Sequence, residues 1–398
     1  MYTSDCYVSV TPGGLGRLCR IQKSVHLGLL ALALCFTWSV FADDYYWVST
    51  SDGAWIDPNN WSSSSPGTYP DQNGAGIDRV FFQDLSATTQ VTVDLAGANY
   101  SIGFLDFNND STIYNIKNSD NAGALPSAYE TLDVTWLIYK QGSAKVNVSD
   151  TKLSANYFTN VVGSFNFVAD NVVTILTGAG VVGGGTVCFD AGPGFSFSSP
   201  SFSVFNNGTL KINTSSGATF SASIINVASV INSGCSPGTA YIQGNLFYQP
   251  TGRSDFELDM PNVIASGSDY FSVNGNLTID GTINIINLPN FGEGSYRLFD
   301  YTGVLVNNGV HLGMVPTGFV ARLDFSTPNQ VNLVVLTPAL LHIALDHGNA
   351  ILSWTNAGYR LESTPLLGTG AVWTVLPGSS PVTVTITNST QFFRLISP

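Results

Sequence analysis

One short pattern recurs through the middle of this chain and restricts its fold more than any other feature. Each copy is a glycine, then Thr or Asn, then an apolar residue, any residue and a second apolar residue. The copies begin at Gly185, Gly208, Gly244, Gly275 and Gly281, and the larger steps between them are 23, 36 and 31 residues. Side chains alternate sides along a strand, so each triplet directs two apolar side chains into a shared core. Corner glycines and a loose period of this size are typical of β-solenoid coils.

Residues 271–285 show the strand period most clearly. Apolar residues or glycine occupy the odd positions, and Ser, Asn, Thr or Asp occupy the even positions. This alternation predicts one buried face and one solvated face. Asn274-Gly275 and Asp280-Gly281 supply residues that accept a positive φ, so we expect them to divide the stretch into three short strands.

Gly178, Gly180 and Gly183 match the G-x-G-x-x-G pattern of dinucleotide-binding proteins. That fingerprint requires a helix after the glycines and an acidic residue about 20 residues further on. The segment that follows contains two prolines and two more glycines, and no Asp or Glu occurs between Asp190 and Asp255. The glycines are therefore expected to lead into a solenoid strand and not to hold a phosphate.

The N-terminus, residues 1–42, is predicted to be a secretory signal peptide. Basic residues such as Arg17 and Lys23 precede an apolar stretch, and a cleavage site of the usual kind ends at Ala42. We expect export, a location outside the cell or on the surface of a bacterium, and no transmembrane segment after cleavage.

Composition narrows the choice of fold and partner. The chain carries a net charge of −13, which disfavours nucleic acid and anionic membranes as partners. Only 10% of the residues are charged while 12% are aromatic, a balance that argues against disorder. Gly, Pro, Asn and β-branched residues interrupt nearly every helical window, so an all-β fold is expected. Residues 149–158 are the one stretch predicted as a short helix.

The chain is predicted to contain two domains after the signal peptide. The solenoid body spans residues 43–336, and Thr337-Pro338 begins a linker. Residues 340–398 carry denser strand signals, at 341–345, 350–354, 359–362, 372–376, 382–386 and 392–396. About six short strands in about 60 residues predict a small C-terminal β-sandwich.

The cysteines suggest one cross-link. Three of the five lie in the predicted signal peptide, which leaves Cys188 and Cys235. In an oxidising compartment these two form one disulfide, and in the alternative they are two isolated buried thiols.

An acidic stretch is the main candidate for chemistry. Asp255, Glu257 and Asp259 alternate with apolar residues, so on a strand the three carboxylates share one face. Such a row supplies oxygen ligands for Ca²⁺. It also supplies the acid and base of a polysaccharide-cleaving site, since glycosidases need two carboxyl groups. The alternative is a solvated face opposite a buried one, which the alternation predicts by itself.

Aromatic residues gather near the start of the body. Trp47, Trp55 and Trp61 are candidates for carbohydrate binding, because exposed rings stack on sugars. The alternative is a cap over the open end of the solenoid core, which terminal units of such folds must cover.

Three stretches resemble secreted proteins of known families. Y-Y-W-V-S-T-S-D-G-A-W-I-D-P-N-N-W and the later P-D-Q-N-G-A-G-I-D-R-V-F-F resemble the opening of bacterial proteins with autotransporter-associated β-strand repeats. S-D-Y-F-S-V-N-G-N-L-T-I-D-G-T-I-N-I, followed by F-G-E-G-S-Y-R-L-F-D-Y-T-G, is similar to the terminal coils of such passengers. I-L-S-W, Y-R-L-E-S-T, V-W-T-V-L and Q-F-F-R-L resemble a small C-terminal β module of exported proteins from Verrucomicrobia-type bacteria.

The resemblance implies a right-handed parallel β-helix, export, and a structural or adhesive role. Autotransporters also end in a membrane β-barrel, which the unit 340–398 is too short to supply, so we expect another route to the surface.

Three functions follow as hypotheses. The first is a non-enzymatic secreted or cell-surface structural or adhesion protein, whose partners are cell-surface or extracellular-matrix components, polysaccharide among them. The second is a polysaccharide-active lyase or glycosidase on a β-helix scaffold, and the third is a carbohydrate-binding protein. The sequence holds no H-E-x-x-H motif, no catalytic residue is assigned, and Ca²⁺ is the one cofactor suggested.

Overall fold

The structure, a computed structural model, describes residues 9–11, 14–16, 43–74, 76–86, 89–119, 130–214, 218–234, 237–264, 267–387 and 390–396. The chain divides into two units, Met1–Val40 and Phe41–Pro398. In the first unit β1 (Ser9–Thr11) pairs antiparallel with β2 (Gly14–Gly16). Most of the predicted signal peptide lies outside the described residues, so its assignment stays a prediction.

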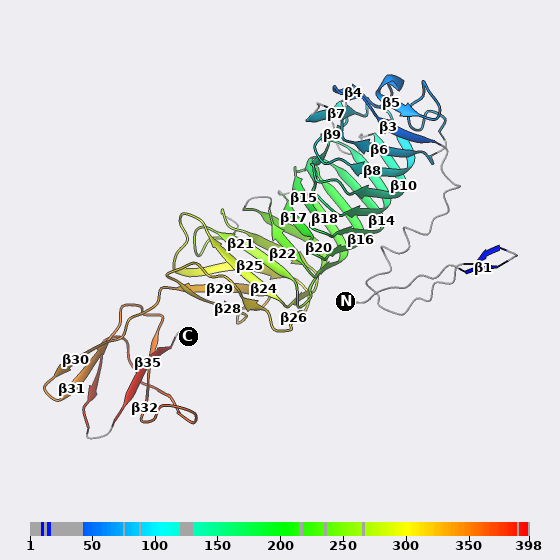
Figure 1. Ribbon diagram of the computed structural model, residues 1–398. Helices are drawn as coiled ribbons and strands as arrows, with labels where there is room; N and C mark the ends of the chain where they lie inside the picture. The colour runs from blue at the N-terminus through cyan, green and yellow to red at the C-terminus, as the bar shows by residue number, and fades with distance from the viewer. Residues whose placement is uncertain are drawn as a thin grey trace. The chain divides into compact units, whose positions relative to one another are not determined.

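Each coil of the body contributes one long strand and one short strand (Figure 1). The long strands are β8 (Tyr100–Asn108), β10 (Thr131–Lys140), β12 (Lys152–Asn160), β14 (Val172–Val181), β16 (Ser196–Val204), β18 (Thr219–Val227) and β20 (Thr239–Tyr248). The short strands that follow them are β9 (Ile113–Lys117), β11 (Val146–Ser149), β13 (Ser164–Ala169), β15 (Thr186–Ala191), β17 (Thr209–Thr214), β19 (Val230–Ser233) and β21 (Arg253–Leu258).

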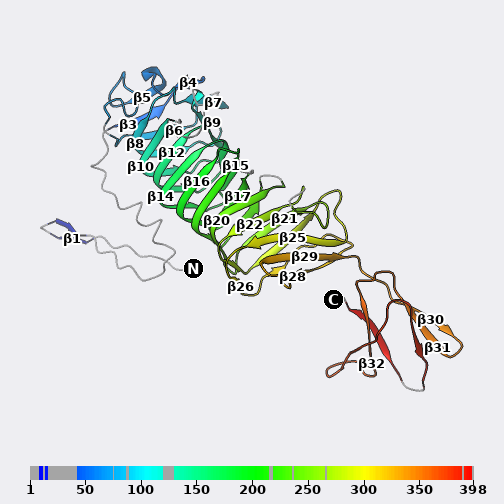
Figure 2. The same cartoon turned by 180° about the vertical axis from the view of Figure 1, so that it is seen from behind.

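Long strands stack on long strands and short strands on short strands, always in parallel. In the described part of the chain the long strands belong to a 16-stranded sheet and the short strands to an 11-stranded sheet. The short strands follow one another from coil to coil (Figure 2). This arrangement confirms the predicted all-β fold with long parallel sheets, as expected of a β-solenoid.

Every long strand bends near its middle. The pairing register shifts between Val134 and Leu137, and it shifts again at the same level in the neighbouring coils. In the next coil the long strand is divided into β22 (Tyr270–Asn274) and β23 (Leu277–Ile279), which both pair with β20. The bend is therefore a corner, and β24 (Thr282–Asn287) continues the short-strand sheet.

The recurring glycine pattern marks two different corners. Gly185, Gly208 and Gly281 directly precede the short strands β15, β17 and β24. Gly244 and Gly275 lie instead at the bend of the long strands. The interval from Gly208 to Gly244 therefore runs from one kind of corner to the other. This difference explains why the spacing of the glycine pattern varies.

The G-x-G-x-x-G segment is a strand, a turn and a strand. Gly178 and Gly180 lie within β14, and Gly183, at φ +66°, lies in the turn before β15. No helix follows, as the sequence predicted, so no helix N-terminus is available for a pyrophosphate.

The core is filled by aromatic rings that stack from coil to coil. Phe167 lies against Phe189 with ring centroids 4.9 Å apart, and Phe197 lies against Phe220 at 4.7 Å. In both pairs the two residues are in register on neighbouring strands of adjacent coils. The parallel ladder thus places like side chains on top of one another.

Antiparallel strands lie at both ends of the body. At the N-terminal end are β3 (Asp44–Trp47), β4 (Gly53–Ala54), the 3-10 helix η1 (Pro58–Asn60), β5 (Trp61–Ser63), β6 (Arg79–Gln83) and β7 (Gln90–Asp94), and β3 pairs antiparallel with β5. At the other end are β25 (Gly294–Tyr301), β26 (Leu305–Asn307), β27 (His311–Leu312), β28 (Val320–Asp324) and β29 (Gln330–Leu336), and β29 pairs antiparallel with β25 and β28.

The helix predicted at residues 149–158 is wrong. These residues end β11 and form most of β12, which pairs in parallel with β10 and β14. Leu153, Ala155 and Phe158 are buried in the core. The buried residues are two and then three positions apart, as expected of a strand that carries one extra residue at its bend. Pairing with the strands of two neighbouring coils outweighs the local helix propensity.

All six strands predicted in the C-terminal unit are present. They are β30 (His342–Asp346), β31 (Asn349–Ser353), β32 (Arg360–Thr364), β33 (Thr374–Val375), β34 (Val382–Thr385) and β35 (Phe392–Ile396). They form two antiparallel sheets, in the orders β30-β31-β34 and β33-β32-β35. A small cluster of Ala350, Leu352, Trp354 and Leu361 is buried in this unit.

Gly244 tests the role of the corner. Its φ is +137°, and a Cβ there would lie 1.7 Å from the carbonyl oxygen of Ala222. We expect Gly244→Ala to lower the free energy of unfolding by more than about 2 kcal/mol, because the corner must open. Gly292→Ala is the control, since a Cβ there meets nothing within 4 Å. Equal denaturation midpoints for the two variants, measured by circular dichroism, would contradict this account of the corner.

Candidate functional site

The three tryptophans proposed for sugar binding are buried. Trp47 is 2% exposed, Trp55 is 0% and Trp61 is 7%. Trp47 and Trp55 each lie 5.0 Å from Trp61 between ring centroids. The rings pack edge to face on one another and lie within the core, so their faces are not available to a sugar. This placement agrees with the alternative, a cap over the end of the core.

Asp255 and Glu257 of β21 and Asp259 directly after it are partly exposed, and Asp255 and Asp259 are hydrogen-bonded to separate partners. Asp255 accepts hydrogen bonds from Arg253 at 3.1 Å and from Asn284 at 2.7 Å. Asp259 accepts hydrogen bonds from the side chain and backbone of Asn290, which lower its pKa. Burial alternates along β21, as in the alternative from the sequence, in which one face of the strand is solvated and the other is buried.

A fourth carboxylate lies beside this strand. Asp269 is 2% exposed, and it accepts hydrogen bonds at 2.9 Å from the backbone N–H groups of Gly238 and Glu257. Burial raises the pKa of Asp269 to about 7, against the lowering effect of these two donors. The sequence analysis missed Asp269, because its contact with Glu257 depends on the fold of the loop between β21 and β22.

Among the residues that the structure describes, no group of three or more His, Cys, Asp or Glu side chains is placed to hold a metal ion. Cys188 is disulfide-bonded. Cys235, the partner that the sequence predicts, lies outside the described residues.

A row of aromatic side chains lies on the outer face of the long-strand sheet. We call it the outer aromatic patch, and its members, all partly exposed, are Tyr46, Phe81, Phe104, Tyr139 and Tyr157. The Tyr46 and Phe81 rings stack with centroids 4.8 Å apart, and Phe104 lies 6.2 Å from Phe81. Leu137 lies between Phe104 and Tyr157 in the register of three adjacent strands.

Asp106 lies within this patch. It is in register between Phe81 and Tyr139, and the residue is only 7% exposed. Burial raises the pKa of Asp106 to about 6, although the Gln141 amide and the Lys140 charge lower it. The Gln141 amide donates to both carboxylate oxygens, at 3.1 and 2.9 Å.

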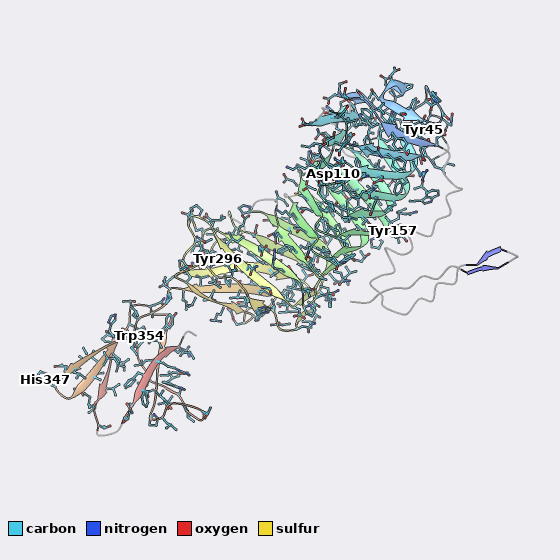
Figure 3. The ribbon with its side chains drawn as sticks, viewed as in Figure 1. Tyr45, Asp110, Tyr157, Tyr296, His347 and Trp354 are labelled. Carbon is cyan, nitrogen blue, oxygen red and sulfur yellow. The ribbon has the colours of Figure 1, made fainter. Side chains whose placement is uncertain are left out.

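The patch offers a surface of the kind that stacks on sugar rings. Its partly exposed aromatic side chains present apolar faces with polar edges. The sequence analysis missed it because its members come from five strands with no common spacing. The signal that was available is the alternation in β6, β8 and β10, where large apolar residues occupy the face opposite the buried one. Figure 3 labels Tyr157 among these side chains.

Trp55 tests the cap. We expect Trp55→Ala to lower the free energy of unfolding by about 3–5 kcal/mol, because it removes a fully buried ring that also donates a hydrogen bond to Pro70. Tyr241→Ala is the control, since that ring is 40% exposed. Similar thermal midpoints for the two variants would show that Trp55 does not hold the cap.

Asp106 predicts a pH dependence of stability. Its folded pKa of about 6 exceeds an unfolded value of about 3.9, so the folded state binds the proton more tightly. The contribution of the protonated Asp106 carboxyl to the free energy of unfolding is fully present below about pH 4 and is lost as the pH rises through about 6. We expect Asp106→Asn to be more stable than the wild type at pH 8, by on the order of 3 kcal/mol at most, and this gain should vanish at pH 4.

Chemical denaturation at pH 4, 6 and 8 measures this difference. Asp190→Asn, which removes an exposed carboxylate, is the charge-matched control. Asp269 titrates in the same direction, so Asp106→Asn removes only part of the wild-type dependence. A gain for Asp106→Asn that is equal at pH 4 and 8 would contradict the assignment.

Comparison with known proteins finds a partial similarity to an autotransporter adhesin. A search of protein-family models finds no match. The chain is 35% identical over 100 residues to the adhesin BmaC autotransporter of Brucella suis biovar 1 (strain 1330). The aligned stretch is 24% of this chain and 3% of that adhesin, so the chain spans only a small part of the relative's length. In the described part of the chain, no helix has the length and apolarity needed to cross a membrane. The partial similarity and the long parallel sheets together fit a passenger-like β-solenoid.

Proposed function

We propose that this chain is a non-enzymatic bacterial adhesion protein that acts at the cell surface or in the extracellular space. The observation that carries the proposal is the 35% identity to part of an autotransporter adhesin, on a chain that folds as parallel coils. A solenoid presents extended faces and needs no cleft for such a role.

The outer aromatic patch is the surface we propose for adhesion. Partly exposed aromatic rings supply apolar contact area, and little conformational entropy is lost when they are fixed on binding. The Tyr hydroxyl groups also form hydrogen bonds with water or with a ligand. Asp106 and Gln141 add a hydrogen-bonding pair beneath the rings. The ligand class that this chemistry fits is a polysaccharide or the glycan of an extracellular-matrix component.

Several finer features belong to the same proposal. The coils form a right-handed parallel β-helix, since parallel crossovers are right-handed in nearly all proteins. Residues 1–42 direct export, and residues 340–398 form a small β-sandwich like the module of exported Verrucomicrobia-type proteins. We further propose that the disulfide partner of Cys188 is Cys235, which fits an oxidising compartment.

An enzyme that acts on polysaccharide is the weaker alternative. Its candidate acids, Asp255 and Asp259, are each held by a different partner. Glycosidases need two carboxyl groups that act on opposite sides of one bond, and hydrogen bonds to other side chains already occupy these two.

Tyr157 tests the proposal. We expect beads coated with the full chain to bind surfaces that present bacterial, plant or animal polysaccharides, and Tyr157→Ala to lower binding at least about tenfold, because one stacked ring contributes about 1.4 kcal/mol. Tyr241→Ala is the matched control, since Tyr241 is an exposed tyrosine of β20 on the same sheet. Equal losses in both variants would reject the patch. Cleavage of any polysaccharide that Asp255→Ala abolishes would reject the non-enzymatic function.

A further inference from the structure

Strand β30 (His342–Asp346) is an exposed edge. It is the first strand of the sheet β30-β31-β34, and in the described residues its ladder partner is β31 alone. All five of its residues are exposed. Ile343 and Leu345 are 56% and 78% exposed, although they lie opposite the buried Leu352 and Ala350.

The hairpin turn shows which backbone groups of β30 point outward. His347 and Gly348, at φ +45° and +83°, form a two-residue turn that Asp346 and Asn349 close (Figure 3). Such a turn makes its flanking residues a hydrogen-bonded pair, and antiparallel pairs alternate. His342, Ala344 and Asp346 therefore bond to β31, while the N–H and C=O groups of Ile343 and Leu345 point away from it.

The other edges of this unit carry features that block pairing. Pro381 directly precedes β34, β33 has only two residues, and β35 carries Arg394. Proline, short length and a basic side chain are the devices that proteins use to protect an edge. Strand β30 has five residues and no proline, lysine, arginine or bulge, and its one acidic residue, Asp346, lies at the end next to the turn, so the rest of this edge is left open.

We propose that β30 pairs antiparallel with β30 of a second copy of this chain, about a twofold axis at Ala344. Ile343 then lies opposite Leu345 of the second copy, and the four outward groups of each strand form four hydrogen bonds between the chains. His342 lies opposite Asp346 of the second copy, and an imidazole N–H donates to a carboxylate in either protonation state. The two ends of the same strand are thus complementary to each other.

The contact is small. Pairing of two five-residue strands buries less than the roughly 1,200 Å² of a stable interface, so the dimer is weak in solution. A weak contact is effective between chains crowded on one surface, where a second binding event is intramolecular. The dimer joins two sheets of three strands into one sheet of six.

Cysteine cross-linking tests the register. The full chain is prepared with Cys6, Cys19 and Cys35 changed to serine, and then with Ala344→Cys or with Asp346→Cys. Ala344 faces its own copy in a non-hydrogen-bonded pair, about 4.5 Å apart between Cα atoms, which suits a disulfide. We expect mild oxidation to give a covalent dimer with Ala344→Cys and at least about tenfold less with Asp346→Cys. Equal yields, or a dimer only with Asp346→Cys, would overturn the proposal.

Sedimentation equilibrium gives an independent test without cysteines. We expect Leu345→Lys to raise the dissociation constant at least about tenfold, because it places a charge on the paired edge. Val372→Lys is the matched control, since Val372 is 76% exposed in the same unit. A wild type that stays monomeric at millimolar concentration, or equal effects of the two variants, would reject the dimer.

Discussion

The backbone ladder between successive coils is the interaction on which the rest of this protein depends. It places each residue above its counterpart in the previous coil, so that like side chains form columns. Inside, the columns are aromatic stacks such as Phe167 on Phe189. Outside, Asn115, Asn147 and Asn166 lie in one column and pass a chain of amide hydrogen bonds at 2.8 Å from coil to coil. The corner glycines let each coil turn within its own layer, which keeps the ladder in register.

Most of the fold could be predicted from the sequence, because strand periodicity and turn residues are local signals. The sequence pattern predicted a corner at both Gly185 and Gly244. Only the strand pairing shows that these are two different kinds of corner. The same limit explains the helix predicted at residues 149–158, where two neighbouring coils decide the conformation of Leu153 and Ala155. Local sequence signals indicate the conformation that a segment prefers by itself, whereas pairing with the adjacent coils decides the conformation that it adopts.

The candidate surface was harder to predict for the same reason. Trp47, Trp55 and Trp61 lie close together in the sequence and attracted attention, yet they are buried as a cap. Phe81, Asp106 and Tyr139 are far apart in the sequence and meet because three strands share one register. Surfaces of a solenoid are assembled across coils, so residues one coil apart are neighbours, and the loops that vary in length hide that spacing.

The antiparallel strands at the two ends have a consequence for how such proteins change over time. Each coil contacts only the coils next to it, while β3 with β5 and β29 with β28 terminate the stack. A duplicated or deleted coil therefore leaves both ends intact and costs one layer of contacts. The fold therefore places little constraint on the number of coils.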